Sequence, residues 1–261
     1  MVDGALGARG AGSSADRIAF LGHASVLIEL EGVRLLTDPL LRSRVAHLRR
    51  QAPPIPAGSF ADVDVVLISH LHHDHLDLPS LRLLGRDTEL VVPLGAGRWL
   101  RGRGFTRVSE LSVGDGLSMA GTQIVAVPAH HDGRRAGGPA GETIGYLVGE
   151  RRVVYFAGDT ELFPAMSKLA PSLDVALLPV AGWGPNLGPG HMGPLDAARA
   201  LAAIQPRIAI PVHWGTLLPV GLARRHRARL GDPPRLFAEY AARLAPAVEV
   251  RILAPGQATK L

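Results

Sequence analysis

Short apolar runs, separated by Gly, Pro and charged residues, recur along the whole chain. Runs of four to eight residues rich in Val, Ile and Leu are typical of β-strands. The nearly continuous run Val63–Ser69 predicts a strand that is covered on both faces. The other predicted strands are Ile18–Leu21, Ser25–Leu30, Val33–Thr37, Leu90–Pro93, Thr122–Val127, Thr143–Val148, Arg152–Ala157, Asp174–Val180, Arg207–Val212 and Val248–Leu253.

Helical patterns are fewer. Leu78–Leu84 follows Asp77, a favourable N-cap, and has Pro79 in its first turn. The other predicted helices are Leu162–Leu169, Pro194–Ile204 and Pro234–Leu244. Because strands outnumber helices and the two kinds alternate, the pattern predicts an α/β fold with two sheets and helices outside them. Two long segments that contain Pro and Arg, Pro39–Ala61 and Trp214–Pro233, are predicted to be irregular, and such loops are often functional.

The composition narrows the class of protein. The chain has 261 residues, of which 47% are hydrophobic and 20% are charged, which excludes a disordered or fibrous protein. No apolar run is long enough for a membrane-spanning helix, and no secretory signal pattern occurs near the start. We therefore predict a flexible leader over residues 1–15, a single domain over residues 16–261 and a cytoplasmic location. Cysteine is absent, so any metal must be bound by His, Asp or Glu.

The formal net charge is +5, and a basic balance can indicate a nucleic-acid partner. The basic residues are mostly Arg, however, and they are scattered in pairs such as Arg49–Arg50 and Arg151–Arg152. A nucleic-acid footprint requires clustering, so we interpret most of this charge as solvated surface and do not predict a nucleic-acid partner.

The chemistry is concentrated in the stretch from Ser69 to Asp77, which directly follows the predicted buried strand. In an extended chain, His70 and His72 point to the same side and can bind one divalent ion. Asp74 and His75 come next, where the chain turns toward a helix, and can face a second ion beside the first. Buried His and Asp without partners would cost several kcal/mol each, so packing alone does not explain the cluster.

Three further strand ends carry metal-binding side chains. The pair His130 and His131 follows one predicted strand, Asp159 follows another, and His213 follows a third. Sheet folds place their active sites at the carboxyl ends of strands. Each residue is a weak signal alone, but with the first cluster they supply enough ligands for two metals.

The order His70-x-His72-x-Asp74-His75, then one His, one Asp and one His, resembles the metallo-β-lactamase superfamily. The resemblance runs from about Asp16 to the end of the chain. Several shorter stretches are similar to the branch that contains L-ascorbate-6-phosphate lactonase and the N-acylphosphatidylethanolamine phospholipase D. They are Gly22–Ile28, Thr37-Asp38-Pro39, Gly158-Asp159-Thr160, Met192–Ala198 and Pro211–Thr216.

The resemblance implies an αββα sandwich of two mixed β-sheets, with helices on the outer faces and two metals at one edge. It assigns His70, His72 and His131 to one metal. It assigns Asp74, His75 and His213 to the other, with Asp159 as the bridge. The family pattern Pro-Ala-x-His favours His131 over His130 as the ligand. The two divalent ions are expected to be Zn²⁺, and Mn²⁺ or Fe also suits these nitrogen and oxygen donors.

The resemblance also implies a mechanism, in which a hydroxide shared by two metals attacks the substrate. Asp74 would orient this nucleophile or accept its proton. His191 would either contact substrate or act in acid–base catalysis, or it is a surface residue of its Gly- and Pro-rich loop. Asp38 and His23 are candidates to orient metal ligands through hydrogen bonds, and His130 is a candidate for a similar role or for substrate contact. Trp183 and Trp214 either line the pocket or pack in the core.

We therefore expect a hydrolase that cleaves an ester, lactone or phosphodiester bond in a small or lipid-like substrate, anionic or neutral. A nuclease-like phosphodiesterase of the same superfamily, an iron-loaded redox protein and a metal-binding protein without turnover remain alternatives. The resemblance leaves a homo-oligomer open.

Overall fold

The computed structural model describes residues 16–169, 172–182, 187–222 and 230–261. The predicted leader over residues 1–15, and Trp183, lie outside the described residues. Among the described helices, none is both long enough and apolar enough to cross a membrane.

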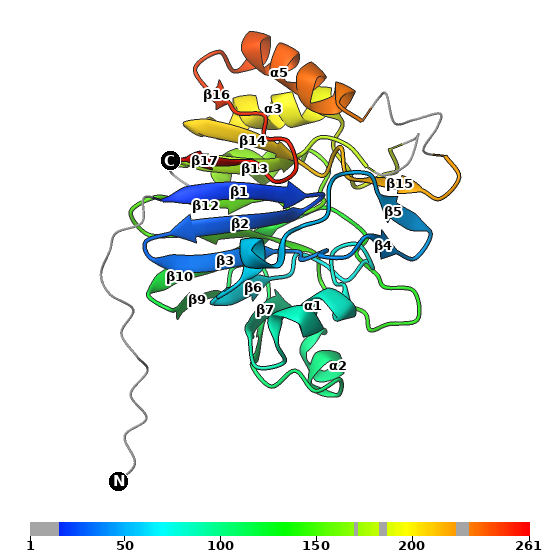
Figure 1. Cartoon of the computed structure of the whole chain (residues 1–261). Helices are drawn as coiled ribbons and strands as arrows, with labels where there is room; N and C mark the ends of the chain where they lie inside the picture. Colours follow the sequence, from blue (N-terminus) through cyan, green and yellow to red (C-terminus); the bar gives the residue numbers. More distant parts are fainter. Residues whose placement is uncertain (1–15, 170–171, 183–186, 223–229) are drawn as a thin grey trace.

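Two sheets of seven strands each form the centre of the described part of the chain (Figure 1). In order across the first sheet, the strands are β17 (Ala258–Lys260), β1 (Arg17–Gly22), β2 (Ser25–Leu30), β3 (Val33–Thr37), β6 (Val65–Leu67), β7 (Glu89–Pro93) and β8 (Val108–Leu111). Across the second, they are β16 (Glu249–Val250), β14 (Ile208–Val212), β13 (Val175–Pro179), β12 (Val154–Phe156), β11 (Ile144–Val148), β10 (Thr122–Pro128) and β9 (Gly116–Met119). Both sheets contain parallel and antiparallel pairs, as predicted for a mixed sandwich.

Helices cover the two sheets from outside (Figure 1). Helices α3 (Pro194–Ile204) and α5 (Asp232–Leu244) pack on the second sheet, where Leu201 and Phe237 join the main core. Helices α1 (Leu78–Leu84) and α2 (Gly97–Arg101) pack on the first sheet. Helix α1 begins as predicted, because the Asp77 side chain accepts a hydrogen bond from the Ser80 backbone N–H.

Strand β6, which lies in the segment predicted to be covered on both faces, is indeed buried on both. Val65 and Leu67 point between the two sheets and belong to the main core. Val66 and Ile68 point the other way, toward α1 and α2. All four side chains are fully buried, so this strand is packed on both faces directly before the candidate metal-binding motif.

The largest differences from the predicted elements lie in one predicted helix, in one predicted strand and in the two segments predicted to be irregular. Leu162–Leu169 is not an α-helix but contains the 3₁₀ helix η2 (Pro164–Lys168), with backbone bonds that span three residues. Val248–Leu253 is a strand only over Glu249–Val250, because the chain then turns and forms β17 against β1 of the other sheet. The segments predicted to be irregular contain a small sheet of β4 (Arg44–Val45), β5 (Leu48–Arg50) and β15 (Leu217–Pro219), and the first also contains the 3₁₀ helix η1 (Ala57–Phe60).

Strand direction determines where the polar motifs meet. Strands β3 and β6 are parallel, so Asp38 and His70, which follow them, lie at the same edge of the first sheet. In the second sheet β12, β13 and β14 are parallel to one another. Strand β10 runs in the same direction as β12, because β11 lies between them and is antiparallel to both. His131, Asp159 and His213 therefore follow strands that end on one side.

Candidate metal centre

The first part of the site is the turn that follows β6. Residues 72–75 form a tight turn in which His75 and Leu76 both donate backbone hydrogen bonds to the carbonyl of His72. This turn directs the side chains of His72, Asp74 and His75 toward the same sheet edge, while His73 is exposed to solvent. His73 thus lies outside the cluster.

One group of imidazoles is formed by His70, His72 and His131, whose ligand atoms all lie within 4.8 Å of one another. The Nε2 atom of His131 lies 3.1 Å from Nδ1 of His72, across 59 residues of sequence. A carboxylate oxygen of Asp159 lies 4.0 Å from Nε2 of His70. The structure therefore brings together the three residues that the resemblance assigns to one metal, with Asp159 beside them.

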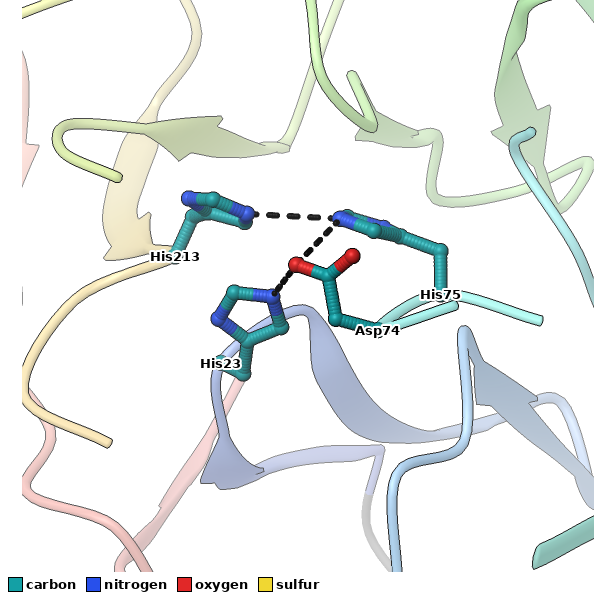
Figure 2. A group of neighbouring side chains, drawn as sticks. All are labelled: His23, Asp74, His75 and His213. Carbon is teal, nitrogen blue, oxygen red and sulfur yellow. Dashed lines mark hydrogen bonds and ion pairs between the residues drawn. The ribbon is translucent and has the colours of Figure 1, made fainter. Parts of the chain in front are cut away.

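A second group is formed by His23, Asp74, His75 and His213 (Figure 2). Nε2 of His75 lies 3.3 Å from Nε2 of His213 and 3.8 Å from the carboxylate of Asp74. Asp159 lies between the two groups, with one oxygen 3.2 Å from His75 Nε2 and the other 3.3 Å from His213 Nε2.

Four of the imidazoles are held by their Nδ1 atoms, so that Nε2 faces the site. His131 Nδ1–H donates to the Gly190 carbonyl and His213 Nδ1–H donates to the Ala181 carbonyl, since a carbonyl oxygen only accepts. His75 Nδ1 contacts the Asp38 carboxylate at 2.7 Å. Ser69 Oγ donates to the same carboxylate and lies 3.0 Å from Nδ1 of His70. Metal-binding histidines usually have such partners, which hold the ring and select its tautomer.

Two buried atoms of the site have no hydrogen-bond partner within the described residues. They are Nε2 of His70 and Oδ1 of Asp159. Moreover, His75 and His213 face each other through Nε2 although both use Nδ1 as a donor elsewhere. Without a proton or a cation between them, two lone pairs would point at each other. The donor set and these unpaired atoms fit a bound divalent cation.

Burial and charge act in opposite directions on the pKa values of these groups. Burial lowers the pKa of His131 to about 4 and that of His213 to about 3, so both rings are neutral and available as ligands at pH 7. Burial also lowers the pKa of His75, but the carboxylates of Asp159, Asp74 and Asp38 outweigh it and raise the pKa well above its usual value. The site thus has an excess of negative charge around His75, which a cation would neutralise.

The carboxylates are kept ionised by the same imidazoles. Burial raises the pKa of Asp159, yet His213 and His75 lower it well below the usual value. Burial likewise acts against ionisation of Asp74, and His75 and His23 lower its pKa well below the usual value. Both carboxylates are therefore charged at neutral pH, as a metal ligand must be.

The turn that carries His23 is tied to the turn that carries His213. The His213 N–H donates to the His23 carbonyl at 2.7 Å, and the His23 N–H donates to Thr216 Oγ1 at 2.7 Å. Both histidines have positive φ values, 57° and 62°. These bonds connect the two sheets directly at the site.

His191 lies at the rim of the centre. Its Nδ1–H donates to the carbonyls of Gly188 and Pro189, and its Nε2 lies 3.5 Å from the Asp159 carboxylate. Its ligand atom also groups with those of His131 and Asp159, so a direct bond to a cation is compatible with this position.

The remaining predicted residues lie farther from the clusters. His130 is exposed and its ring stacks on Phe163, with ring centroids 4.3 Å apart, and its contact with substrate stays a prediction. Trp214 is buried, stacks on Phe20 and donates to the Pro211 carbonyl, which is the packing alternative that the sequence left open.

Sequence reasoning did not assign roles to Ser69 or to the carbonyls of Ala181 and Gly190, which anchor the imidazoles. Ser69 could have been noticed, because it precedes the motif directly. The carbonyls carry no sequence signal, since every residue has one.

Comparison with known proteins agrees with this geometry. Residues 33–214 match the family model described as a beta-lactamase superfamily domain. The chain belongs to the beta-lactamase superfamily. Both the predicted family and the predicted metallo-β-lactamase fold are confirmed, and this superfamily member is a hydrolase.

Two relatives and one solved structure illustrate the similarity. A UPF0173 metal-dependent hydrolase from Methanopyrus kandleri is 34% identical over 252 residues, which span 92% of this chain and 98% of that protein. An N-acyl-phosphatidylethanolamine-hydrolyzing phospholipase D from Caenorhabditis elegans is 31% identical over 77% of this chain and 64% of that protein. The metallo hydrolase Igni18 from Ignicoccus hospitalis has a TM-score of 0.75 and covers 95% of this chain and 99% of its own, and at 21% identity it supports the fold alone.

Proposed function

We propose that this superfamily member is a metal-dependent hydrolase with two divalent cations, which cleaves an ester, lactone or phosphodiester bond. His70, His72 and His131 would hold one cation, and Asp74, His75 and His213 the other. Asp159 would bridge them, since its carboxylate lies 4.0 Å from Nε2 of His70 in the first group and 3.2 Å from Nε2 of His75 in the second.

The observation that carries this proposal is the convergence of imidazole Nε2 atoms on the Asp159 carboxylate. His75 and His213 are both anchored through Nδ1, yet their Nε2 atoms lie only 3.3 Å apart and both contact Asp159. Two neutral rings could not adopt this arrangement without placing lone pairs against one another in a buried site, so it requires either a proton or a cation between them. A shared cation satisfies all these atoms at once.

When bound, the cations supply a water of lowered pKa and polarise the substrate oxygen under attack. Within the chain, Asp74 is placed to orient the nucleophile and accept its proton, because one of its oxygens is held by His23 at 2.9 Å. His191, whose Nδ1–H is committed to loop carbonyls, presents Nε2 to the site and is placed to contact substrate or donate a proton to the leaving group.

The donors are imidazole nitrogens and carboxylate oxygens, which supports Zn²⁺, with Mn²⁺ or Fe as compatible alternatives. The phospholipase D from C. elegans is named for hydrolysing a phosphodiester in a lipid, which supports a phosphodiester as the first substrate class to test. The cytoplasmic location, the single domain and a homo-oligomer stay predictions.

The test begins with the metal content of the purified protein, measured by inductively coupled plasma mass spectrometry. We expect close to two equivalents of transition metal, removed by chelator dialysis and restored by Zn²⁺. Turnover is then measured on bis(p-nitrophenyl) phosphate, p-nitrophenyl acetate and a γ-lactone. Less than one equivalent of metal, or no turnover of any of the three by the loaded protein, contradicts the proposal.

Two variants in the same turn make the test specific. Asp74→Asn keeps the size of the side chain and removes its charge, and we expect turnover to fall by about 100-fold or more. His73→Ala is the matched control, because His73 is exposed and lies outside both clusters. It should keep its metal and its activity. Iron content with redox activity would instead favour the redox alternative, and salt-dependent DNA binding would favour the nuclease-like one.

A further inference from the structure

Three loops of the site meet at Gly190, which is buried although its neighbours Pro189 and Gly188 are exposed. The Gly190 carbonyl accepts the Nδ1–H of His131 at 3.0 Å. Its N–H donates to the carboxylate of Glu161 at 3.3 Å. One glycine thus contacts the loop that carries His131 and the loop that carries Asp159.

Those two loops are also joined to each other. The His130 N–H donates to Thr160 Oγ1 at 2.9 Å, and the Glu161 N–H donates to the His130 carbonyl at 3.1 Å. Gly190 therefore docks on a pair of loops that is already connected, and its position is set by both.

No side chain fits at this point. A Cβ on Gly190 would lie 2.9 Å from Nδ1 of His131, 3.1 Å from its Cα and 3.3 Å from the His130 carbonyl oxygen. The φ angle of Gly190 is +74°, which other residues rarely adopt. At Gly188, two positions earlier, a Cβ would meet nothing within 4 Å.

We propose that Gly190 is a positioning residue that couples the loop carrying His191 to the metal centre, with Glu161 as its anchor. By accepting the Nδ1–H, its carbonyl selects the His131 tautomer whose Nε2 faces His72. The same peptide segment then places His191 Nε2 3.5 Å from Asp159. This inference rests on the metal-dependent function proposed above.

The experiment compares Gly190→Ala with Gly188→Ala in the full chain. The affinity for each equivalent of metal is measured by chelator competition with Zn²⁺, and the ligand field is measured by the absorption spectrum of the Co²⁺-loaded protein. We expect Gly190→Ala to lower the affinity for one of the two metal equivalents by about 10–100-fold. The Co²⁺ spectrum should change and kcat should fall. Gly188→Ala should match the wild type in metal affinity and in the Co²⁺ spectrum.

A second pair of variants applies if Gly190→Ala does not fold. Glu161 is exposed, so Glu161→Ala removes the anchor of the Gly190 N–H without opening the core. We expect a several-fold loss of affinity for the same equivalent, and Glu161→Gln, which keeps an acceptor oxygen, should restore it.

The outcomes separate the two proposals. If the wild type binds two equivalents and turns over substrate, but Gly190→Ala and Glu161→Ala are indistinguishable from it, the coupling role is overturned and the proposed function stands. If the wild type binds no metal tightly, both are overturned together.

Discussion

The Nε2 atom of His23 lies 2.9 Å from a carboxylate oxygen of Asp74, although 51 positions separate the two residues. His23 is buried in the turn between β1 and β2, and its ring packs on that of His213 with centroids 4.0 Å apart. An imidazole in this position can hold Asp74 in one orientation without itself lying in the turn that carries the motif. The contact makes the predicted role of His23 open to experiment.

Replacing His23 tests this role. We expect His23→Ala to lower kcat by about 10–100-fold, because Asp74 loses the hydrogen bond that orients it. His23→Gln keeps a donor of similar reach and should recover part of the activity. The measurement is steady-state kinetics on the zinc-loaded protein, with KM and kcat determined separately. Equal losses in both variants would argue that the ring acts only by packing.

Asp38 is the acceptor at the centre of the anchoring network. Its carboxylate is fully buried and accepts from the Ser69 N–H, the Ser69 hydroxyl and His75 Nδ1. Asp38→Asn tolerates the positive φ of 34° but cannot accept all three bonds. We expect zinc affinity to fall by at least about 10-fold in chelator competition. Unchanged affinity would show that His75 needs no carboxylate behind it.

Arg135 supports the motif turn from outside. Its guanidinium donates to the carbonyls of Leu71 and Leu76, which lie on either side of residues 72–75, and it packs over the Trp99 ring. We expect Arg135→Met to lower the free energy of unfolding by about 1 kcal/mol, measured by urea denaturation. Arg134→Met is the control, because Arg134 is exposed and pairs only with neighbouring Asp132 in the described structure. Equal free energies of unfolding for the two variants would show that the hydrogen bonds from Arg135 to the two carbonyls do not stabilise the fold.

Metal affinity should depend on pH in two stages. Burial lowers the pKa of His75, but nearby carboxylates, Asp159 foremost, raise it well above the usual value, so the apoprotein holds a proton there at pH 7. Metal uptake should therefore release about one proton near neutral pH. Below pH about 4, where His131 is also protonated, the fall in affinity should become steeper.

Calorimetric titration of Zn²⁺ into apoprotein in buffers of different ionisation enthalpy counts the released protons. The His73→Ala protein serves as the control, since His73 lies outside the clusters. Uptake at pH 7 without proton release would mean that His75 is neutral before the metal binds.

Much of the fold follows from local pattern. The apolar runs identify most strands, and the Asp77 cap places the start of α1 correctly. The small sheet of β4, β5 and β15 was missed, because its strands are two or three residues long and pair across the chain, as Leu218 does with Arg49. Val248–Leu253 was predicted too long, because an apolar run does not reveal where a chain leaves one sheet for another.

By itself, the sequence determined which side chains are candidates for the chemistry, because imidazoles and carboxylates placed directly after apolar strands are a local property. Only the tertiary structure decided how these side chains face one another, since His72 meets His131 and His75 meets His213 through contacts between the two sheets. It also decided which nitrogen of each ring is free, because the carbonyls of Ala181 and Gly190 that hold Nδ1 come from distant loops. Every residue has a backbone carbonyl, so the residue type does not show which carbonyl will hold a ring. The orientation of the imidazoles is therefore decided only when the loops pack together.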